Sequence, residues 1–313
     1  MATKFSGDSW KEEKAAKLTA AREALSQGLA ALQTDDDWMR ALRITGALGK
    51  FSPRRYSFTN QILLAKQNAD FRGVAGFESW KKAGRHVKKG ARARTVFAPA
   101  MFKRQRTQTD PDGNESVVEI GCVTFRPIAV FDYGQTEGDE LQAPELPNIE
   151  APEAFERSVE SLRDVALALD GRPVSAIRFI EVAPDTAAHG WFDRSTREIV
   201  VVTRGRTRAD QFKTLAHEVA HAILHGTDEH HSRPVKEIEA ESVAFVVSHA
   251  LGLDTGGYSF PYVASWASHD EEPVEKVVAR TGDRIVKAAN RILDALVRDI
   301  AASETAEGVG ECA

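Results

Sequence analysis

Two histidines and a glutamate in one short segment form the clearest chemical pattern of the sequence. The segment TLAHEVAHAILH places His217, Glu218 and His221 in the arrangement HExxH. On a helix, positions four residues apart project from the same face, so both imidazoles can reach one ion at about 2.0–2.1 Å. Glu218 then lies beside that ion and can act as a base on its bound water. The pattern predicts a hydrolytic metal site, with zinc as the expected ion and manganese as the alternative.

The residues around this motif are almost all apolar, which predicts a buried helix. Buried imidazoles and carboxylates need a partner or a metal. The alternative interpretation is a chance motif whose histidines are satisfied by ordinary core partners. A second acidic helix close behind, KEIEAESVAFVVSHALGL, favours the metal, because a carboxylate commonly supplies the third protein ligand of a catalytic zinc site.

Three glutamates of this second helix are candidates for the third ligand. Glu237 and Glu241 are four residues apart and share a face, whereas Glu239 lies about 160° away from that face by helical geometry. We expect Glu237 to bind the metal and Glu241 to hold a ligand imidazole in place, with Glu239 as the alternative ligand.

Three further histidines follow in the segment HGTDEHH, whose composition is typical of a solvated loop. We therefore expect His225, His230 and His231 to be surface residues and not ligands.

The paired segments HEVAHAILH and EIEAESVAF resemble the zincin metallopeptidases with a glutamate third ligand, in particular the branch attached to mobile-element proteins. In that branch the later helix carries ExxxD or a close variant, and this chain has Glu241 where the branch has Asp. The segment LGLDTGGYSFPYVASWA also resembles the region that follows in this branch. Such hydrolases often stabilise the oxyanion with a Tyr or His, which makes Tyr258 and Tyr262 candidates, with ordinary packing as the alternative for each.

The first half of the chain is strongly basic. From Arg40 to Arg106 there are seventeen Lys and Arg residues but only two acids, Asp70 and Glu78. This gives about +15 for the segment; since the whole chain carries −5, the remainder is about −20. Such an asymmetry suggests a polyanion partner for the basic part.

Aromatic residues interleave with these cations, a mixture that suits single-stranded nucleic acid because phosphates need cations and unpaired bases stack on aromatic faces. The alternative is that the aromatic residues form a small core and the charges a solvated surface. The predicted DNA-binding residues are Arg54, Arg55, Tyr56, Lys66, Trp80, Lys81, Lys82, Arg85, Lys88, Lys89, Arg92 and Arg94.

This region resembles the N-terminal domain of the ArdC antirestriction proteins, through YSFTNQILLA, GFESWKKAGRHVKKGARA and VFDYGQTEG. Together with the zincin resemblance it covers most of residues 40–270, in the same domain order. The resemblance implies a module that binds single-stranded DNA, in a protein that accompanies incoming DNA and blunts restriction by the recipient cell.

Apolar periodicity and turn residues predict an α+β fold in two units. The first unit, residues 1–135, has helices at 8–33, 36–49 and 56–68 and a hairpin of strands at 92–103 and 117–131. Residues 136–152 are rich in Pro, Gly and acids and form the expected acidic linker. The second unit, residues 153–313, has a small antiparallel sheet and further helices, namely a helix at 153–170, a strand at 175–182, a hairpin of 191–193 with 198–202, and helices at 208–225, 235–252, 261–267 and 271–301.

The composition excludes several classes of protein. No stretch approaches 18 consecutive apolar residues, and the first residues lack the apolar region of a secretory signal, so we expect no membrane partner. The two cysteines, Cys122 and Cys312, indicate neither a disulfide framework nor a metal pair, which fits a reducing cytoplasm.

These features leave three functional hypotheses. The protein is a single-stranded-DNA-binding antirestriction protein with a metallopeptidase site, a regulatory metalloprotease that cuts a repressor or host factor, or a DNA-coating protein whose metal is only structural. The expected partners are single-stranded DNA and a host or element protein as substrate.

Overall fold

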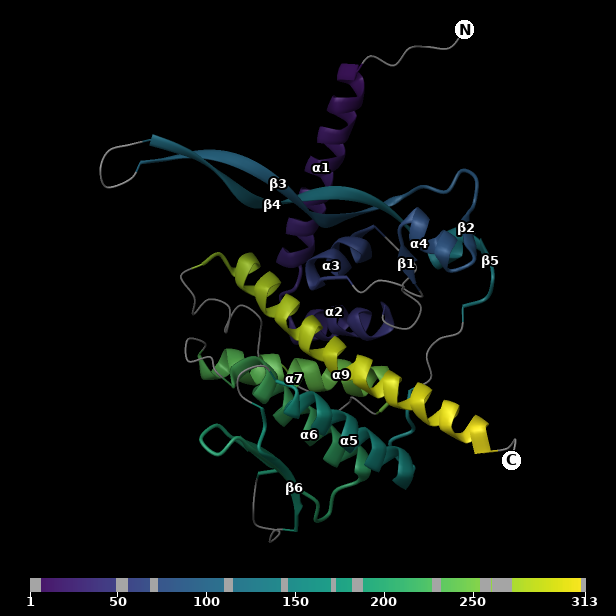
Figure 1. Ribbon diagram of the computed structural model, residues 1–313, viewed down its shortest axis with the longest axis vertical. Coiled ribbons are helices and arrows are strands. Elements are labelled where there is room, and N and C mark those ends of the chain that lie inside the picture. Colours follow the sequence, from purple (N-terminus) through teal and green to yellow (C-terminus); the bar gives the residue numbers. More distant parts are fainter. Residues whose placement is uncertain are drawn as a thin grey trace.

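The computed structural model describes residues 7–48, 56–67, 73–109, 115–141, 146–169, 173–181, 188–226, 232–253, 260 and 272–310. Its helices gather into one body, from which a long two-stranded ribbon extends (Figure 1). Among the described residues, no helix combines the length and the apolar character that crossing a membrane requires.

The chain begins with three helices, α1 (Gly7–Ala30), α2 (Asp35–Leu48) and α3 (Phe58–Lys66). Helix α3 begins where the Ser57 hydroxyl accepts a hydrogen bond from the Asn60 backbone N–H, which satisfies one of the free donors of its first turn. Smaller elements follow, namely β1 (Val74–Ala75), α4 (Phe77–Lys82) and β2 (Arg85–Val87).

The ribbon consists of β3 (Arg94–Thr109) and β4 (Glu115–Asp132), paired antiparallel along their whole length. The body holds the ribbon at its root. There β1 pairs with the end of β4, and two side-chain amides of the α3 region bond the outer edge of β3. Asn60 bonds both backbone groups of Phe97 at 2.7 and 2.8 Å, and Gln67 bonds both backbone groups of Thr95 at 2.8 Å. These amides take the place of a neighbouring strand and protect an otherwise open edge.

After β4 a 3-10 turn, η1 (Tyr133–Gln135), leads into β5 (Thr136–Gly138), which pairs antiparallel with β2. The segment 136–152, which the sequence predicted as a linker, therefore begins as a strand. It also contributes Ile149 to the main core, where this side chain is only 1% exposed.

The second half begins with α5 (Pro152–Leu167) and a three-stranded sheet of β6 (Ala176–Ile180), β7 (Gly190–Asp193) and β8 (Glu198–Val202). The strand order is β6-β8-β7, with β7 antiparallel and β6 parallel to β8. The sheet is thus mixed, whereas the sequence predicted an antiparallel one, because strand direction depends on the path of the chain between β6 and β7 and not on strand composition.

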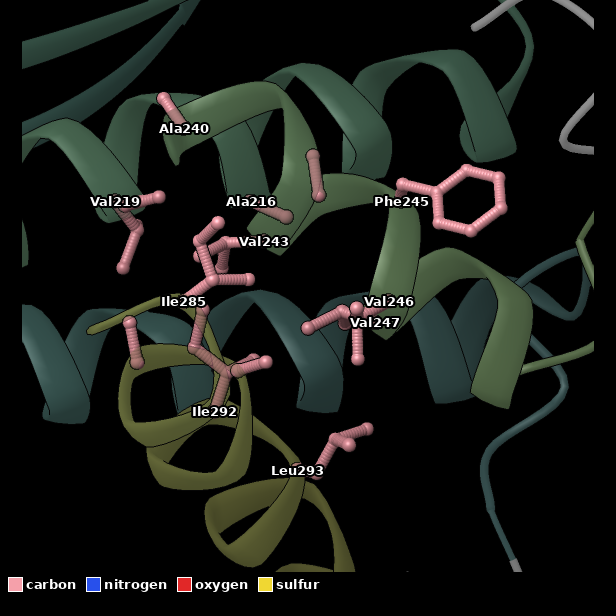
Figure 2. Packing of buried hydrophobic residues seen from close by; sticks show 14 of the residues in the cluster. Ala216, Val219, Ala240, Val243, Phe245, Val246, Val247, Ile285, Ile292 and Leu293 are labelled. Carbon is pink, nitrogen blue, oxygen red and sulfur yellow. The ribbon is translucent and has the colours of Figure 1, made fainter. Parts of the chain in front are cut away.

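Helices α6 (Arg208–His225), α7 (Arg233–Ala250) and α9 (Val274–Gly310) complete the fold. Figure 2 shows side chains of all three in one apolar cluster, with Val219 from α6, Val243 from α7 and Ile285 from α9. Helix α9 also contacts α1 and α3, so it links the two halves of the chain.

The same apolar core includes residues of the first half. Trp38 of α2 is 1% exposed, packs against Phe58 with ring centroids 5.4 Å apart, and donates a hydrogen bond from its indole N–H to Ser242 of α7 at 3.0 Å. The α+β fold class is confirmed. Helices α2 and α3 pack on the second half, and they also contribute Ile44 and Leu64 to a smaller apolar cluster with Val74, Val96 and Val130.

Candidate metal centre

Helix α6 presents the HExxH residues from a buried position. A reciprocal capping interaction between Thr207 and Asp210 fixes its start, and its apolar side chains enter the main core. His217 and His221 lie on one face, with ring centroids 4.7 Å apart and their Nε2 atoms 3.1 Å apart. The helix therefore aims two imidazole nitrogens at one point, as the spacing predicted.

Helix α7 brings a carboxylate to the same point. The Oε2 atom of Glu237 lies 3.6 Å from the Nε2 atoms of both His217 and His221. A tetrahedral ion with ligands at about 2.0–2.1 Å would separate its ligand atoms by about 3.3 Å. The three atoms therefore fit a divalent metal ion, and their donor set of two imidazoles and one carboxylate is typical of a catalytic site with an open fourth position.

Charges around these atoms favour a cation. Burial lowers the pKa of His217, but hydrogen bonds to Glu237 and Glu241 outweigh it and raise this pKa to about 9. Hydrogen bonds from the imidazoles of His217 and His221 hold the pKa of Glu237 well below its usual range. A metal ion bound by these groups would compete with protons, so its affinity should fall as pH falls.

Glu241 lies one turn beyond Glu237 and holds the far side of His217. Its Oε2 atom is 3.0 Å from Nδ1 of His217, and its Oε1 atom is 3.8 Å from the ammonium of Lys213. A carboxylate bonded to Nδ1 keeps the proton on that atom and leaves Nε2 free to bind a metal. This is the geometry expected for the role that the sequence suggested for Glu241.

Glu239, the alternative ligand, points away from the three converging atoms. It is fully buried, and its carboxylate bonds Arg284 of α9 at 2.8 Å and His225 at 2.8 Å. The structure therefore does not bring Glu239 to the metal centre.

The prediction that His225 is a surface residue was wrong. His225 is the last residue of α6 and is only 2% exposed. Its Nδ1 atom lies 3.0 Å from Nδ1 of His221, and burial lowers its pKa. The sequence did contain a signal for this position, because His225 follows His221 by four residues and so shares its helical face. His230 and His231 lie outside the described residues, as do Tyr258 and Tyr262.

Glu218 faces a cavity of about 460 Å³ that also contains the converging ligand atoms. Its side chain is 7% exposed, and burial raises the pKa of its carboxyl. A raised pKa brings a carboxylate closer to the range in which it can exchange protons with a substrate or with water. The base role of Glu218 stays a prediction, with which this position beside the ligand atoms is compatible.

The edge strand β7 forms one wall of this cavity, with Trp191 41% exposed. It approaches α6 closely at Gly190, where an added Cβ would lie 2.6 Å from the Thr214 side chain and 2.7 Å from the Val200 carbonyl oxygen. Only glycine fits there without moving the strand, a requirement that the sequence analysis missed. Three cations also line the cavity, Arg194, Arg233 and Lys236.

The residues predicted to bind DNA have different environments. Six of them are exposed, namely Lys66, Lys81, Lys82, Lys88, Lys89 and Arg92. Arg94 is partly buried, 3.7 Å from the Asp132 carboxylate. Tyr56 is 9% exposed and lines a hollow beside α3. Arg54 and Arg55 lie outside the described residues.

The structure does not bring two of the predicted residues, Trp80 and Arg85, to the surface. Trp80 is fully buried and donates its indole N–H to the Phe131 carbonyl oxygen at 2.9 Å. Arg85 is 5% exposed, and its guanidinium lies over the Tyr133 ring and donates to Thr136 at 2.8 Å. Residues of β4 and β5, distant in sequence, enclose both side chains. Trp80 and Arg85 therefore stabilise the fold of the N-terminal half.

Comparison with known proteins gives two domain matches. Residues 14–131 match the N-terminal domain of anti-restriction factor ArdC, and residues 176–258 match the IrrE N-terminal-like domain of the M78 peptidases. An uncharacterized protein of Bacillus anthracis, pXO2-81, is 28% identical over 265 residues, which are 75% of this chain and 44% of that protein. The chain thus spans less than half the length of this curated relative.

Two solved structures of the antirestriction protein ArdC from plasmid R388 are similar. The Mn(II)-bound structure is 16% identical, with a TM-score of 0.51 over 88% of this chain and 97% of that one. The metal-free structure is 18% identical, with a TM-score of 0.46 over 83% and 98%. The chain thus combines a domain that matches the ArdC N-terminal family with an M78-type, zincin-like domain around its candidate metal centre, and its solved structural neighbours are ArdC antirestriction proteins.

Proposed function

We propose that this protein binds single-stranded DNA and protects the incoming DNA of a mobile element from restriction in the recipient cytoplasm. We assign DNA binding to residues 1–135, a hydrolytic metal centre to residues 153–313, and the connection between them to residues 136–152. The observation that carries the first assignment is an exposed apolar and basic surface around one hollow of the N-terminal half.

This hollow has a volume of about 390 Å³ and lies between the start of α3, the start of α4 and the root of the ribbon. Aromatic and hydroxyl side chains line it, including Tyr56, Phe97, Phe125, Ser57 and Thr59. Such a lining offers faces on which bases stack and polar groups that bond base edges. The hollow therefore suits an unpaired base better than a base inside a duplex.

The hollow continues onto one face of the ribbon. Phe125 is 62% exposed, and its neighbours in the register place Met101, 75% exposed, and Val123, 58% exposed, on the same face. The exposed Lys103 lies on this same face, whereas the exposed Arg104 and Arg126 lie on the opposite face, because side chains alternate along a strand. This face thus offers apolar and aromatic side chains for base stacking and, at Lys103, a cation for a phosphate.

A binding titration tests this assignment. Fluorescence anisotropy with single- and double-stranded oligonucleotides of one sequence, at two salt concentrations, should give tighter binding to the single strand. The affinity should also fall as salt rises, because phosphate contacts release counterions. Equal affinity for both forms, or no dependence on salt, would contradict the proposal.

In the metal half, His217, His221 and Glu237 would hold the ion, which we propose to be zinc, with manganese as the alternative. A bound divalent ion would supply Lewis acidity and a polarised water to the cleft. Glu218 is placed to accept a proton from a water molecule in the cleft and to return it to a leaving group. This arrangement supports hydrolysis of a peptide bond in a host or element protein.

The variant Glu218→Gln tests whether hydrolysis contributes to protection, since the amide keeps the size of the side chain but cannot accept the proton. We expect it to bind metal and DNA normally and to lose protection of transferred DNA. Unchanged protection would instead favour a DNA-coating role with a structural metal, for which the supporting observation is that the three candidate ligands join α6 to α7.

A regulatory protease is the second candidate, supported by the cavity beside Glu218. Comparing the proteins of cells that express the wild type or Glu218→Gln should then reveal a specific cleaved repressor or host factor. Absence of any such product would count against it.

A further inference from the structure

A chain of four side chains runs from the candidate metal centre to α9. His221 contacts His225 through their Nδ1 atoms at 3.0 Å. Nε2 of His225 lies 2.8 Å from Oε2 of Glu239, and Arg284 donates to both oxygens of this carboxylate at 2.8 and 3.2 Å. Arg284 also donates to the carbonyl oxygen of Leu224, in the last turn of α6, at 2.9 Å. Each of these side chains thus has a defined partner.

Which atoms donate and which accept along these four side chains follows from the Glu239–Arg284 ion pair at one end. The carboxylate of Glu239, paired with Arg284, is an acceptor, so Nε2 of His225 must carry a proton. In the neutral imidazole the other nitrogen, Nδ1, is then an acceptor. Nδ1 of His221 must therefore donate to it, which leaves the Nε2 lone pair of His221 directed at the converging ligand atoms.

The two imidazoles of the centre are thus fixed in different ways. A carboxylate, Glu241, bonds Nδ1 of His217 directly. No carboxylate among the described residues bonds Nδ1 of His221, and His225 stands in that place. We propose that His225, oriented by Glu239 and Arg284, is the positioning residue that fixes the tautomer and ring orientation of His221 for metal binding. This inference rests on the proposed role of His221 as a metal ligand.

The burial of the chain argues against a purely stabilising role. Glu239 is fully buried, the His225 side chain is 3% exposed and Arg284 is 28% exposed. Removing such charges from water is costly, and apolar residues of similar volume often stabilise a core as well or better. A buried polar chain that ends on a metal ligand is better explained by what it does to that ligand.

Two substitutions at one position separate hydrogen bonding from packing. His225→Leu fills the space but removes the acceptor, whereas in His225→Asn the side-chain oxygen takes the place of Nδ1 and can still accept from His221. His249→Leu is the matched control, since this α7 histidine stacks on Phe245 far from the centre. Each full-length variant is assayed for zinc affinity by chelator competition, for the visible spectrum of its Co(II) form, and for melting temperature without metal.

We expect His225→Leu to bind zinc about 10- to 100-fold more weakly, which is the usual effect of removing a partner of a ligand histidine. Its Co(II) spectrum should change, while His225→Asn restores most of the affinity and His249→Leu matches the wild type. The inference is overturned if His225→Leu lowers only the metal-free melting temperature and keeps wild-type affinity. It is also overturned if His225→Asn binds as weakly as His225→Leu. Failure of the wild type itself to bind zinc, cobalt or manganese would instead refute the proposed metal centre.

Discussion

The metal centre and the ribbon depart from the usual distribution of side chains in opposite ways. Around the metal centre, polar groups that are not ligands are buried: Glu239 is 0%, His225 2% and Glu218 7% exposed. On the ribbon, apolar groups are exposed: Met101 is 75% and Phe125 62% exposed. Buried polar groups and exposed apolar patches are the two departures that most often indicate function.

The difference between these regions indicates two kinds of recognition. The buried groups of the metal centre have fixed partners, which suits an ion that requires a defined ligand geometry. The ribbon offers exposed apolar side chains and the exposed cation Lys103, which would suit a polymer whose bases and phosphates vary in position. The proposed metal site has its contacts in place already, whereas the ribbon would gain contacts only if a ligand covered it.

Three consecutive residues of α9 join the two halves. An added Cβ at Gly282 would lie 2.2 Å from the Phe58 ring of α3, so the helices cross at close range there. Asp283 accepts backbone hydrogen bonds at Phe58 and Thr59, and burial raises the pKa of its carboxyl. Arg284 reaches Glu239 beside the metal centre. The start of α3, which lines the hollow, and the metal centre thus share one support.

The largest effect should come from breaking the core that both halves share. Trp38→Ala removes a side chain that is 1% exposed, and we expect it to lower the free energy of unfolding by about 3–5 kcal/mol. Trp38 contacts both α3 and α7. Thermal unfolding of Trp38→Ala, followed by circular dichroism, should therefore show a single transition, at a lower temperature than in the wild type. Trp38→Phe, which keeps an aromatic ring but loses the bond to Ser242, should cost much less. Two separate transitions in the wild type would show that the halves unfold independently.

The metal centre itself should be the next most sensitive region. We expect His221→Ala to lose on the order of 3 kcal/mol of metal-binding free energy, since one of three protein ligands is gone. Its affinity for single-stranded DNA should stay within error, because the hollow and ribbon lie in the other half. Isothermal titration with zinc and with an oligonucleotide measures both quantities. An equal loss of both affinities would show that the regions depend on each other.

The sequence predicted the metal centre more fully than the DNA surface, and the reason is physical. The positions of His217, Glu218 and His221 follow from helical periodicity within one element. The roles of Glu237 and Glu239 also depend on how α7 packs against α6, which the sequence does not specify. His225 was misjudged because the polar residues after it suggested a loop, although Arg284 and Glu239 hold it in the core.

In the N-terminal half, composition predicted a basic surface but not which side chains form it. Arg85 and Trp80 are enclosed by β4 and β5, which follow them by about fifty residues. The hairpin was predicted, yet β3 continues to Thr109, well beyond the predicted 103, while β4 starts at Glu115, close to the predicted 117. Its exposed aromatic face was missed, since alternating strands look alike whether one face is covered or free.

Removing one exposed ring from the ribbon should weaken DNA binding without affecting stability. Phe125→Ala should cost about 1–3 kcal/mol of binding free energy to single-stranded DNA, the usual contribution of a base stacked on an aromatic ring. Because Phe125 is 62% exposed, its melting temperature should be close to that of the wild type. Trp191→Ala is the matched control, an exposed aromatic ring of the metal half. Equal losses in the two variants would argue against a stacking site on the ribbon.

The smallest effect should come from one exposed ion pair of the ribbon. Its two variants should change the affinity for DNA in opposite directions. Lys103 and Glu119 lie 2.8 Å apart, with side chains 77% and 54% exposed, so either neutral variant should change stability by less than about 1 kcal/mol. If phosphates pass along this face, Lys103→Gln should weaken DNA binding and lower the slope of log affinity against log salt by about 0.7. Glu119→Gln should strengthen binding, because it removes a repulsive charge and releases Lys103. Identical responses in the two variants would mean that the DNA backbone does not follow the ribbon.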